Sequence, residues 1–398
     1  MNIERPFAAL GVVIYFISFS ALGAEVLTPK AELGRQLFFD KNLSEPAGQA
    51  CSSCHDPLAA FTDNDKTQPT SKGVDTSLHG NRNAPTVMYA AFSPTFTFDR
   101  QANLYKGGQF WDGRAKTLSN QAKGPFLNPI EMANPTPEAV IEKIKQSPMT
   151  DYSTQFDAIY GKEALEHPAK AYLYVADAIA EFERSAVFNK FTSKYDFYLL
   201  GKARFTAQEK RGLLVFESKD KGNCIACHNS RPTSNTPPLF TDFSYDNIGV
   251  PKNPDNAFYL LPPPFNPSGT AFVDLGLGGQ LKLPDQNGKF KVPTLRNIAL
   301  TSPYTHNGYF ETLRGVVTFY STRNVIKRCT NAFTDEKTAL QQLCWSMPEV
   351  PENVNFNELG NLKLNRQDVN DLIAFLTTLT DGYGATSPWS SLTTPPSQ

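Results

Sequence analysis

Apolar side chains recur at helical spacing in several parts of the chain. Between Ala171 and Phe188 they fall three or four positions apart, which is typical of an amphipathic helix. Near the C-terminus, Asn365 and Asp368 have the pattern of a helix N-cap, and an apolar stripe from Val369 to Leu379 follows them. These patterns predict a mainly α-helical fold.

Two further apolar segments resemble each other. Leu33-Gly-Arg-Gln-Leu-Phe38 and Lys210-Arg-Gly-Leu-Leu-Val-Phe216 each lie ahead of a pair of cysteines and have helical spacing. Long Pro/Gly-rich stretches, such as residues 231–267, predict irregular loops of the kind that wrap cofactors. We therefore expect two small helical domains, at residues 25–200 and 201–385, followed by a tail at residues 386–398.

Charge and the N-terminal segment narrow the class of protein. The net charge is −1 and no basic block is present, so we expect no nucleic-acid partner. Arg5 precedes an apolar run, Phe7–Leu22, that ends in small residues, which predicts a signal peptide at residues 1–24. An uncleaved anchor is the alternative. We expect a periplasmic protein with no integral membrane segment after cleavage, because no other stretch is apolar enough to cross a bilayer.

Two pentapeptides carry the clearest chemistry: Cys51-Ser-Ser-Cys54-His55 and Cys224-Ile-Ala-Cys227-His228. Cys-x-x-Cys-His is typical of c-type haem attachment, in which both thiols form thioethers with one haem and the histidine is the proximal iron ligand. A redox dithiol and half of a zinc site are the alternatives for a single motif. Two such motifs in an exported chain favour two covalently bound c-type haems.

Two cysteines and three histidines lie outside these motifs. Cys329 and Cys344 would be in an oxidising compartment, which favours a disulfide between them. His79, His167 and His306 remain as possible distal ligands, and no methionine stands in an obvious ligand loop. The iron of each haem therefore either binds one of these few side chains as its distal ligand or keeps its distal position free for a substrate.

Several longer motifs also occur in order along the chain. They are Asn83-Ala-Pro-Thr-Val87, Phe110-Trp-Asp-Gly-Arg114, Gln121-Ala-Lys-Gly-Pro-Phe-Leu-Asn-Pro-Ile-Glu-Met132, Pro293-Thr-Leu-Arg-Asn297 and Thr301-Ser-Pro-Tyr-Thr-His306. Together with the second haem motif, they make the chain resemble the bacterial di-haem cytochrome c peroxidases and the MauG enzymes of methylamine utilisation. The resemblance covers nearly all of the chain after the signal peptide and implies two cytochrome c-like haem domains with long irregular loops.

The resemblance implies that the first haem is the peroxidatic one. Its distal pocket would contain Gln121, Pro125 and Glu131, and Trp111 would carry electrons between the haems. The chemistry agrees, because splitting a peroxide bond needs a group that takes a proton from one oxygen and returns it to the other. Glu131 could do so, and Gln121 could orient the peroxide. The alternatives are an exposed helix-end carboxylate for Glu131 and a core aromatic for Trp111.

The resemblance also implies that the second haem, on Cys224, Cys227 and His228, receives the electrons. Asn83 and the backbone carbonyls of Thr301 and Pro303 match a calcium site between the domains. Amide and carbonyl oxygens are ligands that calcium prefers. We therefore expect one calcium ion beside the two haems.

Two positions distinguish the peroxidases from the MauG enzymes. Many peroxidases have a distal histidine eight residues before the calcium-site asparagine, where this chain has Asp75, and His79 is out of register. Peroxidases also have a methionine fourteen residues after the position of His306, where this chain has Tyr320, as in MauG. A phenolate ligand favours higher oxidation states of iron. The alternative is that Tyr320 is a core tyrosine.

The sequence thus predicts a periplasmic di-haem peroxidase that reduces hydrogen peroxide at the N-terminal haem. The donor would be a small c-type cytochrome or a cupredoxin. One alternative is a MauG-like oxidase that modifies residues of a partner protein through a high-valent di-haem state. Another is a non-catalytic di-haem electron carrier, which the scarcity of spare ligands near the first haem disfavours.

Overall fold

Helices supply most of the regular structure, and every strand is two or three residues long. The computed structural model describes residues 26–389, so the predicted signal peptide lies outside the described residues and the predicted tail is described only to Trp389. The helices are α1 (Pro29–Phe39), α2 (Cys51–Cys54), α3 (Leu118–Ala122), α4 (Gly124–Leu127), α5 (Pro137–Gln146), α6 (Tyr152–Tyr160), α7 (Pro168–Arg184), α8 (Lys194–Leu199), α9 (Ala207–Glu217), α10 (Gly276–Leu281), α11 (Leu313–Thr322), α12 (Glu336–Gln342) and α13 (Arg366–Thr377). The strands are β1 (Thr97–Asp99), β2 (Leu104–Lys106), β3 (Tyr245–Asp246), β4 (Phe290–Lys291), β5 (Lys327–Arg328) and β6 (Cys344–Trp345).

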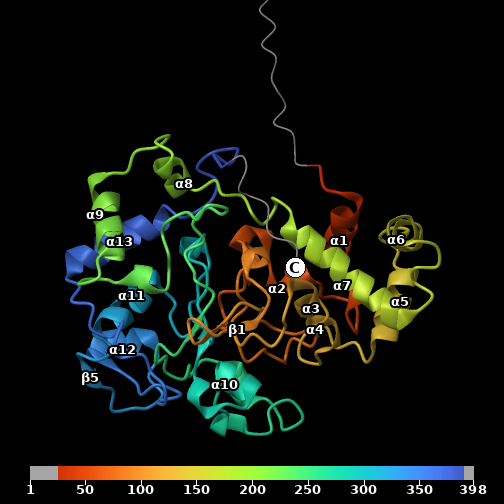
Figure 1. Cartoon of the computed structure of the whole chain (residues 1–398). Coiled ribbons are helices and arrows are strands. Elements are labelled where there is room, and N and C mark those ends of the chain that lie inside the picture. The colour runs from red at the N-terminus through yellow and green to blue at the C-terminus, as the bar shows by residue number, and fades with distance from the viewer. Residues whose placement is uncertain (1–25, 390–398) are drawn as a thin grey trace, which may run out of the picture.

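The helices form two lobes that lie side by side (Figure 1). The N-terminal lobe is built on a core whose buried residues run from Leu33 to Phe191. The C-terminal lobe is built on a core that begins at Tyr195 and ends at Leu379. The three two-stranded sheets pair β1 with β2, β3 with β4 and β5 with β6. The fold is therefore mainly α with long irregular connections, as predicted, while the exact domain boundary at residue 200 stays a prediction.

In the N-terminal lobe, α1 packs against α7 (Figure 1). Thr28 caps α1 by accepting a hydrogen bond from the backbone N–H of Ala31, and proline follows at the first helical position. The two helices touch at Gly34, where an added Cβ would lie 1.9 Å from the carbonyl oxygen of Ala178. Only glycine allows this approach, so Gly34 sets how closely the helix before the first haem motif meets α7.

The C-terminal lobe repeats this arrangement with α9 and α13 (Figure 1). Thr206 caps α9, and an added Cβ on Gly212 would lie 2.0 Å from the carbonyl oxygen of Asp371 on α13. Asn365 caps α13 and forms a capping box with Asp368, which confirms the predicted N-cap. The similar segments before the two cysteine motifs are thus equivalent helices.

Other sequence expectations need small corrections. The helix predicted from Ala171 to Phe188 is α7, which begins three residues earlier and ends at Arg184, where Ser185 caps it. Residues 231–267 are irregular as predicted, apart from β3 and a short 3₁₀ turn at Ala257–Leu260. Both exceptions are too brief to have a recognisable hydrophobic period.

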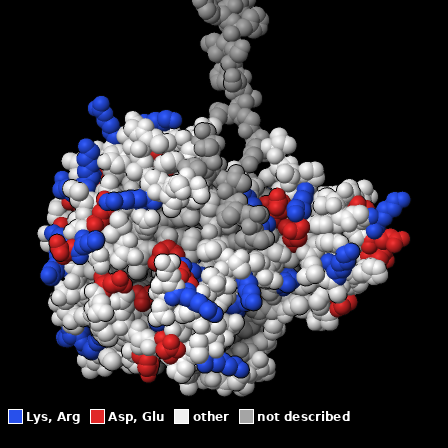
Figure 2. Space-filling view, viewed as in Figure 1, with Lys and Arg blue, Asp and Glu red and all other residues white. Residues whose placement is uncertain are grey.

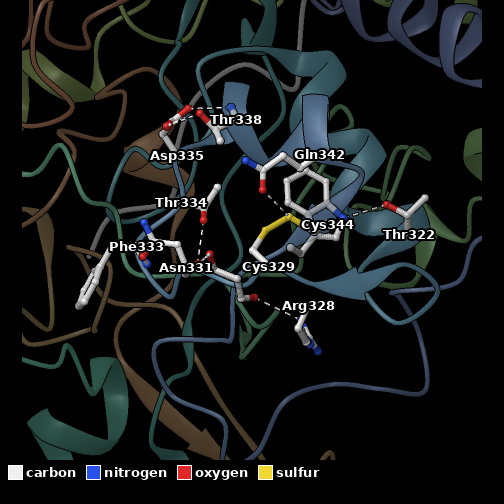
Figure 3. The surroundings of a disulfide bond; sticks show 12 residues. Thr322, Arg328, Cys329, Asn331, Phe333, Thr334, Asp335, Thr338, Gln342 and Cys344 are labelled. Carbon is white, nitrogen blue, oxygen red and sulfur yellow. Dashed lines mark hydrogen bonds between the residues drawn. A yellow bond between two sulfur atoms is a disulfide. The ribbon is translucent and has the colours of Figure 1, made fainter.

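Cys329 and Cys344 form the expected disulfide, which joins the segments of β5 and β6 (Figure 3). The adjacent Trp345 is fully buried, and its indole N–H donates to the hydroxyl of Thr322 at 2.9 Å. Because Thr322 ends α11, the disulfide-bonded segment braces the helix that carries Tyr320.

The surface and the helix lengths bear on possible partners. Lys and Arg side chains are interspersed with Asp and Glu over the face drawn in Figure 2, without a broad basic area. None of the helices within residues 26–389 is both long and apolar enough to pass through a bilayer.

Candidate functional site

The two motif histidines are held in the same way. His55 Nδ1 donates to the carbonyl of Phe61 at 3.0 Å, and His228 Nδ1 donates to the carbonyl of Phe240 at 2.8 Å. Burial lowers the pKa of both imidazoles, which keeps them neutral, and the carbonyl contacts oppose this effect. A neutral imidazole oriented through Nδ1 presents Nε2 to a metal. Both histidines therefore suit the proximal position of a haem.

The four motif cysteines are free thiols, whereas Cys329 and Cys344 are paired. Burial raises the pKa of Cys54 and of Cys224 to about 12, so neither is the low-pKa thiolate of a redox dithiol. Each Cys-x-x-Cys pair thus stands reduced beside an oriented histidine. The donor set fits covalent attachment of one haem per motif.

The same set of backbone contacts supports both histidines, and we call this set the frame. It was not predicted from the sequence. The two accepting residues are Phe61 and Phe240, and both have left-handed backbone angles, with φ of 56° and 54°. Thr86 Oγ1 donates to the carbonyl just before Phe61, and Thr294 Oγ1 donates to the carbonyl just before Phe240, each at 2.6 Å. The signal in the sequence was weak: Phe-Thr-Asp and a Pro-Thr pair do follow each haem motif, but both short patterns also recur elsewhere in the chain, for example at Phe333-Thr-Asp335.

A cavity of about 270 Å³ opens beside the second motif and contains Cys224, Cys227 and His228 in its wall. Tyr320 of α11 lines the same cavity, together with apolar side chains of α11 and α13. Within residues 26–389 the Tyr320 hydroxyl has no hydrogen-bond partner, and burial raises its pKa, with the neighbouring Cys227 and Asp246 adding to the shift. A tyrosine oxygen that has no partner and lines the same cavity as the motif histidine is a suitable distal ligand.

The N-terminal lobe contributes Trp111 and Asn83 to this cavity. Trp111 Nε1 donates to the carbonyl of Asn83 at 2.8 Å. The Asn83 amide lies 2.6 Å from the carbonyl of Pro303 and 3.4 Å from that of Thr305, and Thr301 lines the cavity nearby. Turning the amide over would place its oxygen among these carbonyls. The donors fit the predicted calcium site, and the sequence reading missed the Thr305 carbonyl.

A second, more polar pocket lies in the N-terminal lobe. Glu131 lines it with Phe110, Arg114, Lys123 and Asn128. Burial raises the pKa of Glu131, while the charge of Arg114 and a hydrogen bond from Asn128 oppose the rise. The Glu131 carboxylate in turn adds to the raised pKa of both Cys51 and Cys54, so it lies on their side of the lobe.

The other two residues predicted for the distal pocket lie on neighbouring short helices. Gln121 is in α3, and Pro125 is in α4. The carbonyl of Pro125 accepts from the backbone N–H of Met132 at 3.2 Å, which fixes the turn that carries Glu131. Gln121 and Pro125 are not among the residues that line the polar pocket, so their predicted roles stay predictions.

The remaining histidines and Asp75 lie away from the polar pocket. Asp75 is exposed, and its carboxylate accepts from the N–H and the hydroxyl of Ser77. His79 is buried but lines neither pocket, and His167 is exposed just before α7. His306 lines the cavity beside the second motif, where its ring stacks on that of Phe290 with centroids 3.5 Å apart.

Comparisons with known proteins agree with this geometry. The family model of the di-haem cytochrome c peroxidases matches residues 28–204. The chain is 41% identical over 360 residues to the methylamine utilization protein MauG of Paracoccus denitrificans, covering 88% of each chain. It is 33% identical to the cytochrome c551 peroxidase of Nitrosomonas europaea, covering 80% of each. The crystal structure of the diheme peroxidase BthA from Burkholderia thailandensis superposes with a TM-score of 0.75 and 32% identity, covering 93% of this chain and 91% of that one.

Proposed function

Because the chain belongs to the family of di-haem cytochrome c peroxidases and MauG proteins, we propose that it reduces hydrogen peroxide at a haem attached to Cys51 and Cys54, with electrons relayed through a second haem attached to Cys224 and Cys227. One observation carries the proposal: Glu131, whose pKa is raised by burial, lines a polar pocket in the lobe of the first motif, and its charge acts on both Cys51 and Cys54. The haems, when bound, supply the iron at which the peroxide bond breaks and the path for two electrons.

The protein's own part in this reaction is proton transfer. Hydrogen peroxide takes up two electrons and two protons to give two water molecules. Glu131 would take the proton from one peroxide oxygen and return it to the other, and burial raises its pKa above that of an exposed glutamate. Gln121 would orient the peroxide by hydrogen bonding, and Pro125, whose carbonyl accepts from the backbone N–H of Met132, would hold the turn that carries Glu131.

The relay between the lobes would run through Trp111. The indole lines the cavity of the second motif while its own segment belongs to the N-terminal lobe. A calcium ion held by Asn83 and by the carbonyls of Thr301 and Pro303 would fix this segment, because the Asn83 carbonyl accepts the indole N–H. His55 and His228 would be the proximal iron ligands.

Tyr320 favours a second candidate function. It lines the same cavity as the second motif, where a phenolate would stabilise oxidised iron and let the C-terminal haem share an oxidising equivalent. This would suit MauG-like oxidation of residues on a partner protein. The peroxidase reading instead needs a small c-type cytochrome or a cupredoxin as donor. Both readings place the protein in the periplasm, after removal of residues 1–24.

The test is peroxide turnover by the purified holoprotein with a panel of donors. A small cytochrome or cupredoxin should sustain turnover if the first reading is correct, and a protein substrate should be modified if the second is. Electron paramagnetic resonance of the resting ferric protein should show a high-spin N-terminal haem, since Asp75 stands in place of a distal histidine. Two low-spin haems without a high-spin signal, and no peroxide turnover, would instead indicate an electron carrier.

A further inference from the structure

One partly buried cation in the cavity beside the second motif forms no ion pair with the described residues. Lys291, at the end of β4, is the only lysine or arginine among the described residues that line this cavity. Its Nζ donates to the carbonyl of Gly108 at 2.6 Å and forms no ion pair within residues 26–389. Burial lowers the pKa of Lys291 to about 8, and the charge of Asp112 opposes this only in part. A buried ammonium group of this kind is costly unless an anion accompanies it.

The acidic residues of the cavity have other neighbours. Asp274 is paired with Arg82 at 2.7 Å, and Glu349 lies 3.9 Å from His306. The carboxylates of Asp246 and Glu358 gather around Cys227. None of these side chains forms an ion pair with Lys291, so the protein's own described residues leave this cation facing the cavity.

In the internal repeat, Lys291 of the C-terminal lobe occupies the position equivalent to Asn83 of the N-terminal lobe. Asn83 and Lys291 each stand two residues before a Pro-Thr pair that supports a motif histidine. Both also contact the same tryptophan. The Asn83 carbonyl accepts from Trp111 Nε1, and the Lys291 backbone N–H donates to the Trp111 carbonyl at 2.8 Å. In the C-terminal lobe, a cation therefore occupies the position that a neutral amide holds in the N-terminal lobe.

We propose that Lys291 is the counter-ion of a propionate group of the haem attached at Cys224 and Cys227, and that it positions this haem against the Trp111 segment. A haem carries two propionate carboxylates, and an ammonium group has three N–H donors. One donor is used by Gly108, which leaves two for a charge-assisted contact with a carboxylate. The inference rests on the proposed haem attachment, but not on the choice between peroxide reduction and protein oxidation.

The experiment compares holoprotein variants by redox titration of the C-terminal haem. Removing a positive charge beside a haem stabilises the ferric state, so Lys291→Gln and Lys291→Met should each lower the equilibrium constant for its reduction about tenfold, or about 59 mV. Lys291→Arg should keep the wild-type constant to within about threefold, because the charge remains. The matched control is Lys289→Gln, two residues away, whose Nζ contacts Gln286 outside the cavity; it should leave the constant unchanged.

A second measurement separates the propionate contact from simple support of the loop. Resonance Raman spectra should show a shifted propionate bending band in Lys291→Arg and Lys291→Gln, and none in Lys289→Gln. A wild-type reduction constant in Lys291→Gln, or unchanged propionate bands in Lys291→Arg, would overturn the inference. Haem content distinguishes failure of this inference from failure of the proposed function. One haem per chain in the wild type would overturn the attachment proposal as well. Two haems whose potentials do not change in the Lys291 variants would overturn the role of Lys291 alone.

Discussion

Around each motif histidine, the two lobes provide the same frame, but they differ on the side where a haem would react. His55 and His228 both donate Nδ1 to a phenylalanine carbonyl, and a Pro-Thr pair braces each site. The lobe of the first motif has a polar pocket with Glu131, and a largely apolar cavity with Tyr320 lies beside the second motif. The frame can therefore be duplicated while the chemistry diverges, because attachment and reactivity use different residues.

This difference predicts a division of labour between the lobes. A carboxyl group with a raised pKa can move protons, which the N-terminal lobe needs for peroxide. A buried tyrosine oxygen can bind iron but leaves no space for peroxide, which suits a haem that only passes electrons. Variants in one lobe should consequently change one process and leave the other intact.

The largest effect should come from Glu131→Gln. The amide cannot carry a proton, so peroxide turnover should fall by about two to four orders of magnitude. Both haems should stay attached, and the potential of the C-terminal haem should not change. The measurement is steady-state peroxide consumption at equal haem content. Asp75→Asn is the control, since this carboxylate is exposed and outside the pocket. Wild-type turnover in Glu131→Gln would remove the proton-transfer role.

The next effect concerns the other lobe. Tyr320→Met should replace an anionic oxygen ligand with a thioether and raise the equilibrium constant for reduction of the C-terminal haem roughly a hundredfold. Redox titration with near-infrared spectroscopy measures this change, and the N-terminal haem should keep its potential. Tyr320→Phe is the matched variant, because it keeps the ring in the cavity and removes only the oxygen. If neither variant changes potential or spectrum, Tyr320 is a packing residue.

The sequence predicted these sites unequally, for physical reasons. Covalent attachment and helix packing leave local patterns in the sequence. These patterns predicted the haem motifs, helix α13 with its Asn365 cap, and the similar helices before the two motifs. The roles of Glu131 and Tyr320 depended on a resemblance, because a single carboxylate or tyrosine has no pattern of its own. Lys291 was missed altogether, since its isolation follows from which residues the fold brings near it.

A smaller effect concerns a buried carboxyl group in the N-terminal lobe. Glu183 on α7 is almost fully buried, and burial raises its pKa to about 8, with the charge of Arg184 opposing. The unfolded chain releases this proton near the ordinary glutamate pKa of 4.5, so the folded state binds more protons between pH 4.5 and pH 8. Stability from this group is therefore present below the lower value and decreases as the pH rises towards 8.

Glu183→Gln should remove that pH dependence. From pH 5.5 to 7.5 the wild-type N-terminal lobe should lose about 2–3 kcal/mol of unfolding free energy that the variant retains. Denaturant unfolding at both pH values, followed through the absorbance of the N-terminal haem, provides the measurement. The exposed Glu166, on a loop before α7, supplies the control substitution Glu166→Gln. Parallel pH profiles for Glu183→Gln and wild type would show that the carboxyl group is not held neutral.

The smallest effect should come from calcium, because the ion would act on the contact between the lobes and on neither haem directly. Stripping it with a chelator should slow peroxide turnover several-fold while both haems stay attached. The cause is geometric: the Asn83 carbonyl accepts the Trp111 indole N–H, and its amide lies against the Pro303 carbonyl, so a freed Asn83 would loosen Trp111. Asn83→Leu should reproduce the loss without chelator, and Asn81→Ala should not. Equal turnover in calcium-free and calcium-bound protein would show that packing alone holds Trp111 between the lobes.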